Sequence, residues 1–277
     1  MYPKIKNIIT VTIALFLFQV AVSVPFILLK KSGALEVSND YFLIIVNSVT
    51  ILSVSFYAFR KSNLSFSSML EIKPNFYKFL LSILGVCLFL QILGSFLSHL
   101  IFINSSVSQS FVKSVSQYIP GNTFLLYFLG VVVAPITEEL YFRGFVFAGL
   151  SKNYSWKIAL IVSAGLFALF HINPSQMVAA IIIGLFSGYV LYISNNILLS
   201  IVIHCFYNGL TLFSSFAIAK FDLHNSVFNI KLGWYVIDIV DISSIILLII
   251  SLPYFLRYSR EMKLELENNQ NGIQANV

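Results

Sequence analysis

Two adjacent glutamates and an arginine interrupt a segment that is otherwise apolar enough to lie in a membrane. Residues 134–146 read APITEELYFRGFV and contain Glu138, Glu139 and Arg143. An ionisable group at bilayer depth costs roughly 2.5 to 3.5 kcal/mol on insertion scales, so such groups mark functional sites by default. A carboxylate there can take a proton from water or act as a ligand to a metal ion.

The spacing of these charges predicts different tasks for the two glutamates. On a helix Glu139 and Arg143 are i and i+4 with the acid first, which is the favourable order for an ion pair. Glu138 lies about 100° further round the helix. It is therefore the carboxylate left for chemistry. Pro135 removes one backbone hydrogen bond and is expected to open room beside the acids.

Two histidines and an asparagine on later apolar segments complete a candidate site. His171 ends one apolar run, and His204 and Asn208 lie one helical turn apart on another. A carboxylate such as Glu138 can take a proton from water. Imidazole and amide donors can hold the oxyanion that develops on a scissile carbonyl. Together the four groups predict hydrolysis of an amide bond.

Other interpretations of the same residues stay open. Glu138, His171 and His204 could form a zinc site, although the chain has no His-Glu-x-x-His helix. The acids and Arg143 could also be a helix end that reaches the cytoplasmic interface. Each histidine alone is more often a packed, hydrogen-bonded residue than a catalyst. The combination on three apolar segments favours a functional site.

The composition predicts a membrane protein. Of 277 residues 58% are hydrophobic and 10% charged, whereas soluble domains carry about 25% charged residues. The mean hydropathy is +0.89. The net charge of +6 needs no nucleic acid to explain it, because basic loops bind the anionic lipids of a cytoplasmic membrane face.

Eight apolar runs are close to the roughly 20 residues that cross a bilayer. We therefore predict an all-α membrane bundle of about eight transmembrane helices. The runs lie near 7–29, 41–59, 78–103, 123–150, 156–172, 175–194, 197–217 and 235–256.

The distribution of basic residues predicts that both termini are cytoplasmic. With the N-terminus inside, the inner segments hold eleven basic residues: Lys4, Lys6, Arg60, Lys61, Lys73, Lys78, Lys152, Lys157, Arg257, Arg260 and Lys263. The outer segments hold five: Lys30, Lys31, Lys113, Lys220 and Lys231. We divide the chain into generic membrane helices (1–119), catalytic helices (120–217), a loop with the last span (218–256) and a polar cytoplasmic tail (257–277).

Three motifs resemble the CAAX protease and bacteriocin-processing family of intramembrane endopeptidases, also called Abi. They are Glu138-Glu139-x-x-x-Arg143, then Phe170-His171, then His204-x-x-x-Asn208, within roughly residues 120 to 215. The resemblance implies that Glu138 and His171 activate the attacking water. It implies that His204 and Asn208 form the oxyanion hole, with Glu139 and Arg143 as supporting residues.

The resemblance leaves the metal and the substrate open. Family members have been named metalloproteases, yet the pattern is at least as compatible with a glutamate-dependent mechanism without metal. We favour the site without metal, with zinc as the alternative. Eukaryotic relatives cleave three residues from prenylated proteins, and bacterial relatives are linked to peptide or bacteriocin processing and self-immunity. The Ile-, Asn-, Ser- and Phe-rich composition is typical of a low-GC bacterial chain, so we expect a bacterial cell membrane. We therefore favour the bacterial roles, with a peptide or lipidated protein as substrate.

Two functions from other classes remain as alternatives. One is a non-catalytic membrane immunity or scaffold protein that binds a partner peptide without cutting it. The other is a transporter, because charges inside the membrane also mark ion pathways. A transporter is disfavoured, since the two halves of the chain show no matching pair of broken helices.

Overall fold

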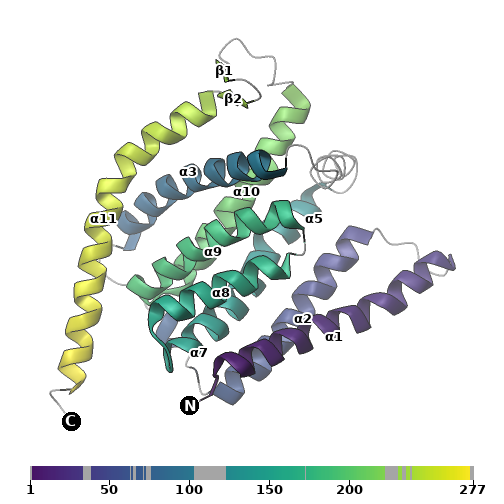
Figure 1. Ribbon diagram of the computed structural model, residues 1–277, viewed down its shortest axis with the longest axis horizontal. Coiled ribbons are helices and arrows are strands. Elements are labelled where there is room, and N and C mark those ends of the chain that lie inside the picture. The colour runs from purple at the N-terminus through teal and green to yellow at the C-terminus, as the bar shows by residue number, and fades with distance from the viewer. Residues whose placement is uncertain are drawn as a thin grey trace.

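A computed structural model describes the chain except for residues 1, 34–38, 63, 65–66, 71, 73–75, 103–122, 172, 222–229, 233–234, 238 and 275–277. Apart from two short strands, the regular elements it describes are helical (Figure 1), so the predicted all-α class is confirmed. The long helices are α1 (Ile5–Lys31), α2 (Asn39–Ser62), α3 (Phe76–Phe102), α8 (Trp156–Phe170), α9 (Pro174–Ser194), α10 (Ile197–Phe221) and α11 (Ile239–Gln274).

The remaining elements are short. A 3-10 turn, η1, covers Ser67–Met69. Strands β1 (Ile230–Leu232) and β2 (Tyr235–Ile237) form an antiparallel pair in which Ile230 lies opposite Ile237.

Several helices have the length and composition of membrane spans, which supports a membrane protein. Within the described residues, four helices are long and apolar enough to cross a bilayer, namely Ile5–Leu29, Phe76–Ser98, Gln176–Ser194 and Ile242–Glu265. Two shorter apolar helices are Trp156–Phe170 and Ile197–Phe213. Large apolar side chains such as Leu81 and Ile249 are exposed on the outer faces of the spans, as lipid contact requires. The total of eight spans stays a prediction.

The fourth predicted span, 123–150, is helical but irregular. It comprises α5 (Thr123–Phe128), η2 (Leu129–Val133), α6 (Ala134–Glu139), η3 (Leu140–Phe147) and α7 (Ala148–Ser151). Both η2 and η3 are π-helical. π-Helical turns inside α-helices are rare and occur frequently at functional sites. The segment with the two glutamates is thus wound irregularly on both sides of α6.

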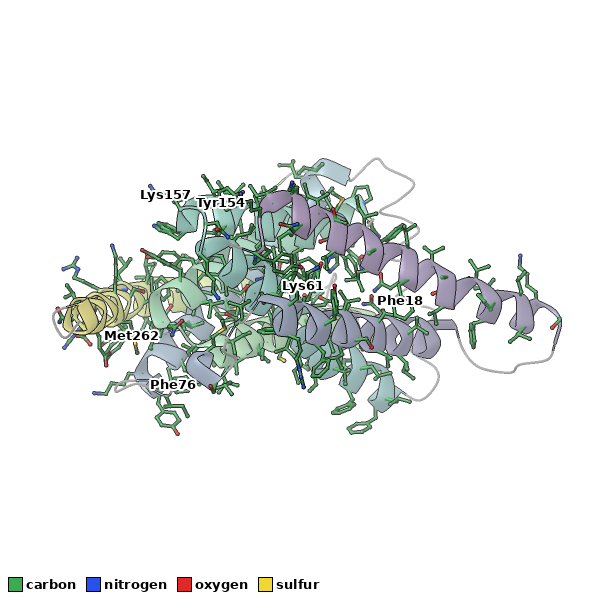
Figure 2. The ribbon with its side chains drawn as sticks, turned by 90° about the horizontal axis from the view of Figure 1, so that it is seen from below. Phe18, Lys61, Phe76, Tyr154, Lys157 and Met262 are labelled. Atoms are coloured by element: carbon green, nitrogen blue, oxygen red, sulfur yellow. The ribbon has the colours of Figure 1, made fainter. Side chains whose placement is uncertain are left out.

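This irregular segment lies at the centre of the helix packing. η3 contacts α2, α8, α9 and α10, and α6 contacts α2 and α10. The first helix is joined to it by a hydrogen bond of 2.9 Å between the hydroxyls of Thr12 and Tyr141. The later part of α1, which carries Phe18, extends away from the centre of the bundle beside α2 (Figure 2).

The orientation leads to a first testable prediction. Because basic residues favour the cytoplasmic side, reporter fusions near residues 35, 113 and 226 should report the outer side. Fusions near 66 and 265 should report the inner side. All these positions except 265 fall outside the described residues. An outer location for residue 265, in α11, would contradict the even number of spans.

Candidate active site

Glu139 and Arg143 form an ion pair inside the helix bundle. Arg143 Nη1 lies 3.1 Å from Glu139 Oε1, and both side chains are 0% exposed. The pair lies where α6 meets η3. The two opposite charges compensate each other in a place that water does not reach, and removing either would leave a costly buried charge.

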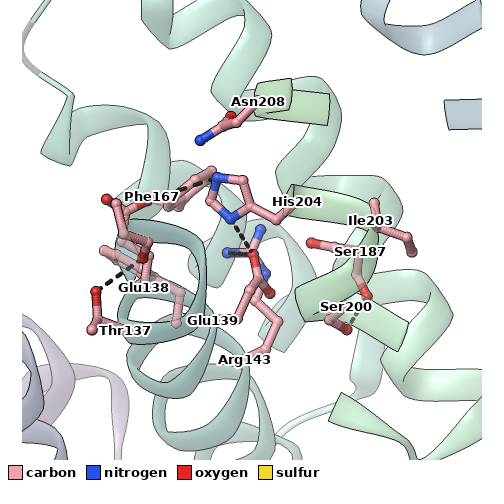
Figure 3. Close-up of polar contacts among 12 residues, drawn as sticks. Thr137, Glu138, Glu139, Arg143, Phe167, Ser187, Ser200, Ile203, His204 and Asn208 are labelled. Atoms are coloured by element: carbon pink, nitrogen blue, oxygen red, sulfur yellow. Dashed lines mark hydrogen bonds and ion pairs between the residues drawn. The ribbon is translucent and has the colours of Figure 1, made fainter. Parts of the chain in front are cut away.

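His204, on α10, is the second partner of Glu139. Its Nδ1 lies 2.9 Å from the same oxygen, Glu139 Oε1. Its Nε2 lies 3.8 Å from Glu138 Oε2. The imidazole, itself buried, therefore faces a carboxylate at each ring nitrogen. In Figure 3 the His204 ring lies between Asn208 and Glu139.

The Phe167 ring packs against both histidines and the arginine. Arg143 Cζ lies 4.5 Å from the Phe167 ring centroid, within cation–π range. The rings of His171 and His204 meet Phe167 edge-on, at centroid distances of 4.8 and 5.3 Å. One buried aromatic ring thus links the two imidazoles and the guanidinium.

Sequence reasoning missed Phe167 and took Phe170 as the aromatic residue of the motif. Phe170 packs against the Phe142 ring, with centroids 5.6 Å apart. The helical period gives the reason, because residues i and i+4 share a face whereas i and i+1 do not. Phe167 lies four residues before His171, and that spacing was the signal available in the sequence.

The end of α8 fixes the orientation of the His171 ring. Its Nδ1 lies 2.9 Å from the Phe167 carbonyl oxygen, one of the carbonyls that a helix C-terminus leaves without a helical donor. A carbonyl oxygen can only accept, so Nδ1 carries the proton in the neutral ring. The unprotonated nitrogen is then Nε2, the atom that can act as a base.

Asn208 is hydrogen-bonded to the irregular segment. Its Nδ2 donates to the Gly130 carbonyl at 3.0 Å. The N–H of Ala134 goes to Leu129 in the π-turn, and Pro135 has no N–H to offer. The Asn208 amide thus supplies the donor that the Gly130 carbonyl does not find within its own helix. The second N–H of the Asn208 amide is left for another acceptor.

The predicted site residues therefore differ in how closely they meet. Glu138, Glu139, Arg143 and His204 are in direct contact. His171 joins them through the ring of Phe167.

The described residues contain no group of three or more His, Cys, Asp or Glu side chains placed to hold a metal ion. The Nδ1 atoms of His171 and His204 both have hydrogen-bond partners within the protein. Only the Nε2 atoms of the two rings are left for any ligand.

Comparison with known proteins shows that the segment carrying this site is similar to a protease family. Residues 120–210 match the model of the Rce1-like family, described as type II CAAX prenyl endopeptidase Rce1-like. The matched segment contains all six site residues predicted above. The match confirms the resemblance drawn from the three motifs, and at family level it supports a CAAX-type intramembrane protease.

A curated relative is the UPF0177 protein YxdF of Lactococcus lactis subsp. lactis (strain IL1403). It is 32% identical over 97 residues, which cover 35% of this chain and 51% of the relative. The chain thus spans about half the length of the curated relative it matches. No solved structure matches the chain significantly.

Proposed function

We propose that this protein is an intramembrane endopeptidase that hydrolyses peptide bonds by means of a water molecule activated by Glu138 and His171. The observation that carries the proposal is the division of labour between the adjacent glutamates. Glu139 is paired with Arg143 at 3.1 Å. Glu138 is buried, and among the described residues its one ion-pair contact is with His204, at 3.8 Å, so its carboxylate is available as a base.

In the proposed reaction Glu138 takes a proton from the attacking water, whose oxygen bonds to the scissile carbonyl carbon. Nε2 of His171 is the second basic atom and orients the same water. When the C–N bond breaks, the proton held by Glu138 passes to the leaving amine. This order conserves protons and requires no further reactant.

His204 and Asn208 are the proposed donors to the oxyanion. Because His204 Nδ1 donates to Glu139, the ring can donate to an oxyanion only with a second proton on Nε2. The neighbouring carboxylates of Glu138 and Glu139 would stabilise that positive charge. The second N–H of Asn208 would be the other donor. Such preorganised donors stabilise charge more effectively in a dry site than in water.

We propose a substrate that reaches the site from the membrane, either a peptide or a lipidated protein. The family match supports substrates near membranes. Processing of a bacterial peptide or bacteriocin, or self-immunity against one, is the role we favour. Cleavage at a prenylated C-terminus, as in the name of the matching family, is the alternative substrate for the same chemistry.

The proposed mechanism needs no metal, and this can be tested directly. A zinc mechanism depends on the ion to lower the pKa of its bound water to about 7, whereas Glu138 is itself a base. Purified protein in detergent would be treated with a chelator, analysed for bound metal, and assayed on a peptide from its native membrane. We expect unchanged activity. Activity that is lost on treatment and restored by stoichiometric zinc would instead make Glu138, His171 and His204 metal ligands.

A further inference from the structure

Helix α9 provides none of the residues of the three motifs, yet it touches the buried arginine. A Cβ added at Gly184 would lie 3.2 Å from Arg143 Nη2 and 3.2 Å from Ala164 Cβ. Both distances are tighter than ordinary van der Waals contact. A side chain at residue 184 would therefore require the guanidinium or Ala164 to shift by a few tenths of an ångström.

The position of this guanidinium depends on packing. Arg143 is 0% exposed, and its Nε, Nη1 and Nη2 atoms have no hydrogen-bond partner of good geometry. The guanidinium meets the Glu139 carboxylate and the Phe167 ring. It also lies so near Gly184 that an added Cβ there would come within 3.2 Å of Nη2. Interiors are packed densely enough that displacements of a few tenths of an ångström are transmitted.

A displaced guanidinium would disturb the proposed oxyanion donor. Arg143 and His204 meet the same atom, Glu139 Oε1, at 3.1 and 2.9 Å. If Arg143 moves away from α9, either the Glu139 carboxylate moves with the guanidinium or their ion pair breaks. In both cases the hydrogen bond between Glu139 and His204 Nδ1 is expected to change.

We infer that Gly184 is a positioning residue for the site: it lets Arg143 hold Glu139 where Glu139 orients His204. The consequence for catalysis rests on the proposed peptidase function. The contact between Gly184, Arg143, Glu139 and His204 stands independently of the reaction.

The test compares two glycine-to-alanine substitutions in neighbouring helices. Gly184→Ala places a methyl group against Arg143. Gly165→Ala, on α8, is the matched control because a Cβ there would meet nothing within 4 Å. Misplacement by about 1 Å can cost about 100-fold in rate, so a smaller shift in Gly184→Ala should lower kcat by about 10-fold. KM should change little, and Gly165→Ala should behave like the wild type.

A double-mutant cycle separates the arginine from helix packing, since Gly184 also approaches Ala164. Arg143→Lys removes the atom that the methyl group would meet. If Gly184 acts through Arg143, adding Gly184→Ala to Arg143→Lys should lower kcat by less than about twofold. If Gly184→Ala lowers kcat as much in that background as in the wild type, the effect comes from α8–α9 packing and the inference is wrong.

A spectroscopic measurement decides the inference without any enzyme assay. With ¹⁵N-labelled histidine, the His204 ring signals report the hydrogen bond of Nδ1 to Glu139, and a His204→Gln sample assigns them. We expect these signals to shift in Gly184→Ala and to stay in place in Gly165→Ala. Unchanged His204 signals in Gly184→Ala would refute the inference. A wild-type protein that cleaves no peptide would contradict the proposed function, and the spectra would still decide the role of Gly184.

Discussion

Glu138→Gln is expected to lower the rate of peptide hydrolysis by about 10²- to 10⁴-fold, the usual contribution of a general base. Glutamine keeps the shape of the side chain and loses the ability to take a proton. Since Glu138 makes no ion pair with Arg143 and lies 3.8 Å from His204, the fold should tolerate the change. The measurement is kcat/KM on a membrane-derived peptide, with the thermal unfolding temperature in the same detergent.

Glu261→Gln provides the matched control. Glu261 is on α11 and pairs with the exposed Arg257, far in sequence from the site, so the variant should keep full activity. A Glu138→Gln protein that retains more than a tenth of the wild-type activity would exclude Glu138 as the base. If the variant keeps an immunity phenotype in cells while the purified wild type cuts no peptide, the non-catalytic scaffold becomes the better account.

Arg143→Met should lower the free energy of unfolding by about 3 to 5 kcal/mol, the cost of removing one partner of a buried ion pair. Methionine has a similar length but no charge. The Glu139 side chain, which is 0% exposed, would lose its guanidinium partner. Reversible unfolding in mixed detergent micelles would measure the change.

Two further variants test the reason for this loss. Arg257→Met breaks an i,i+4 pair whose side chains are 70% and 42% exposed, and it should have a far smaller effect because water screens the charges. Adding Glu139→Gln to Arg143→Met removes the uncompensated carboxylate, so the double variant should be more stable than Arg143→Met alone. Equal losses in Arg143→Met and Arg257→Met would show that burial of the charge is not the cause.

The placement of the buried charges explains why the two glutamates are not interchangeable. Glu139 bonds two partners through one oxygen, Arg143 and His204. Its substitution would disturb folding and chemistry together. Glu138 has no comparable structural partner among the described contacts, so its substitution is the cleaner probe of mechanism.

The sequence by itself predicted the helical membrane class, because long apolar runs in lipid must satisfy their backbone groups internally. It also predicted the Glu139–Arg143 pair, because an i,i+4 contact depends only on the local geometry of one helix. The motif order was enough to suggest the family that residues 120–210 match. The apolar runs, the ion pair and the motif order can all be read along the chain without knowing how the helices pack against one another.

Only the tertiary structure decided which groups meet across helices. The contacts of the two glutamates with His204 could not be read from the chain, because His204 lies 65 positions after Glu139. The hydrogen bond from Asn208 to Gly130 spans 78 positions, and the close approach of Gly184 to Arg143 depends on the packing of α9 against η3. Such contacts depend on the rotation and depth at which helices pack. Those are set by the whole set of interlocking side chains, and no local periodicity encodes them.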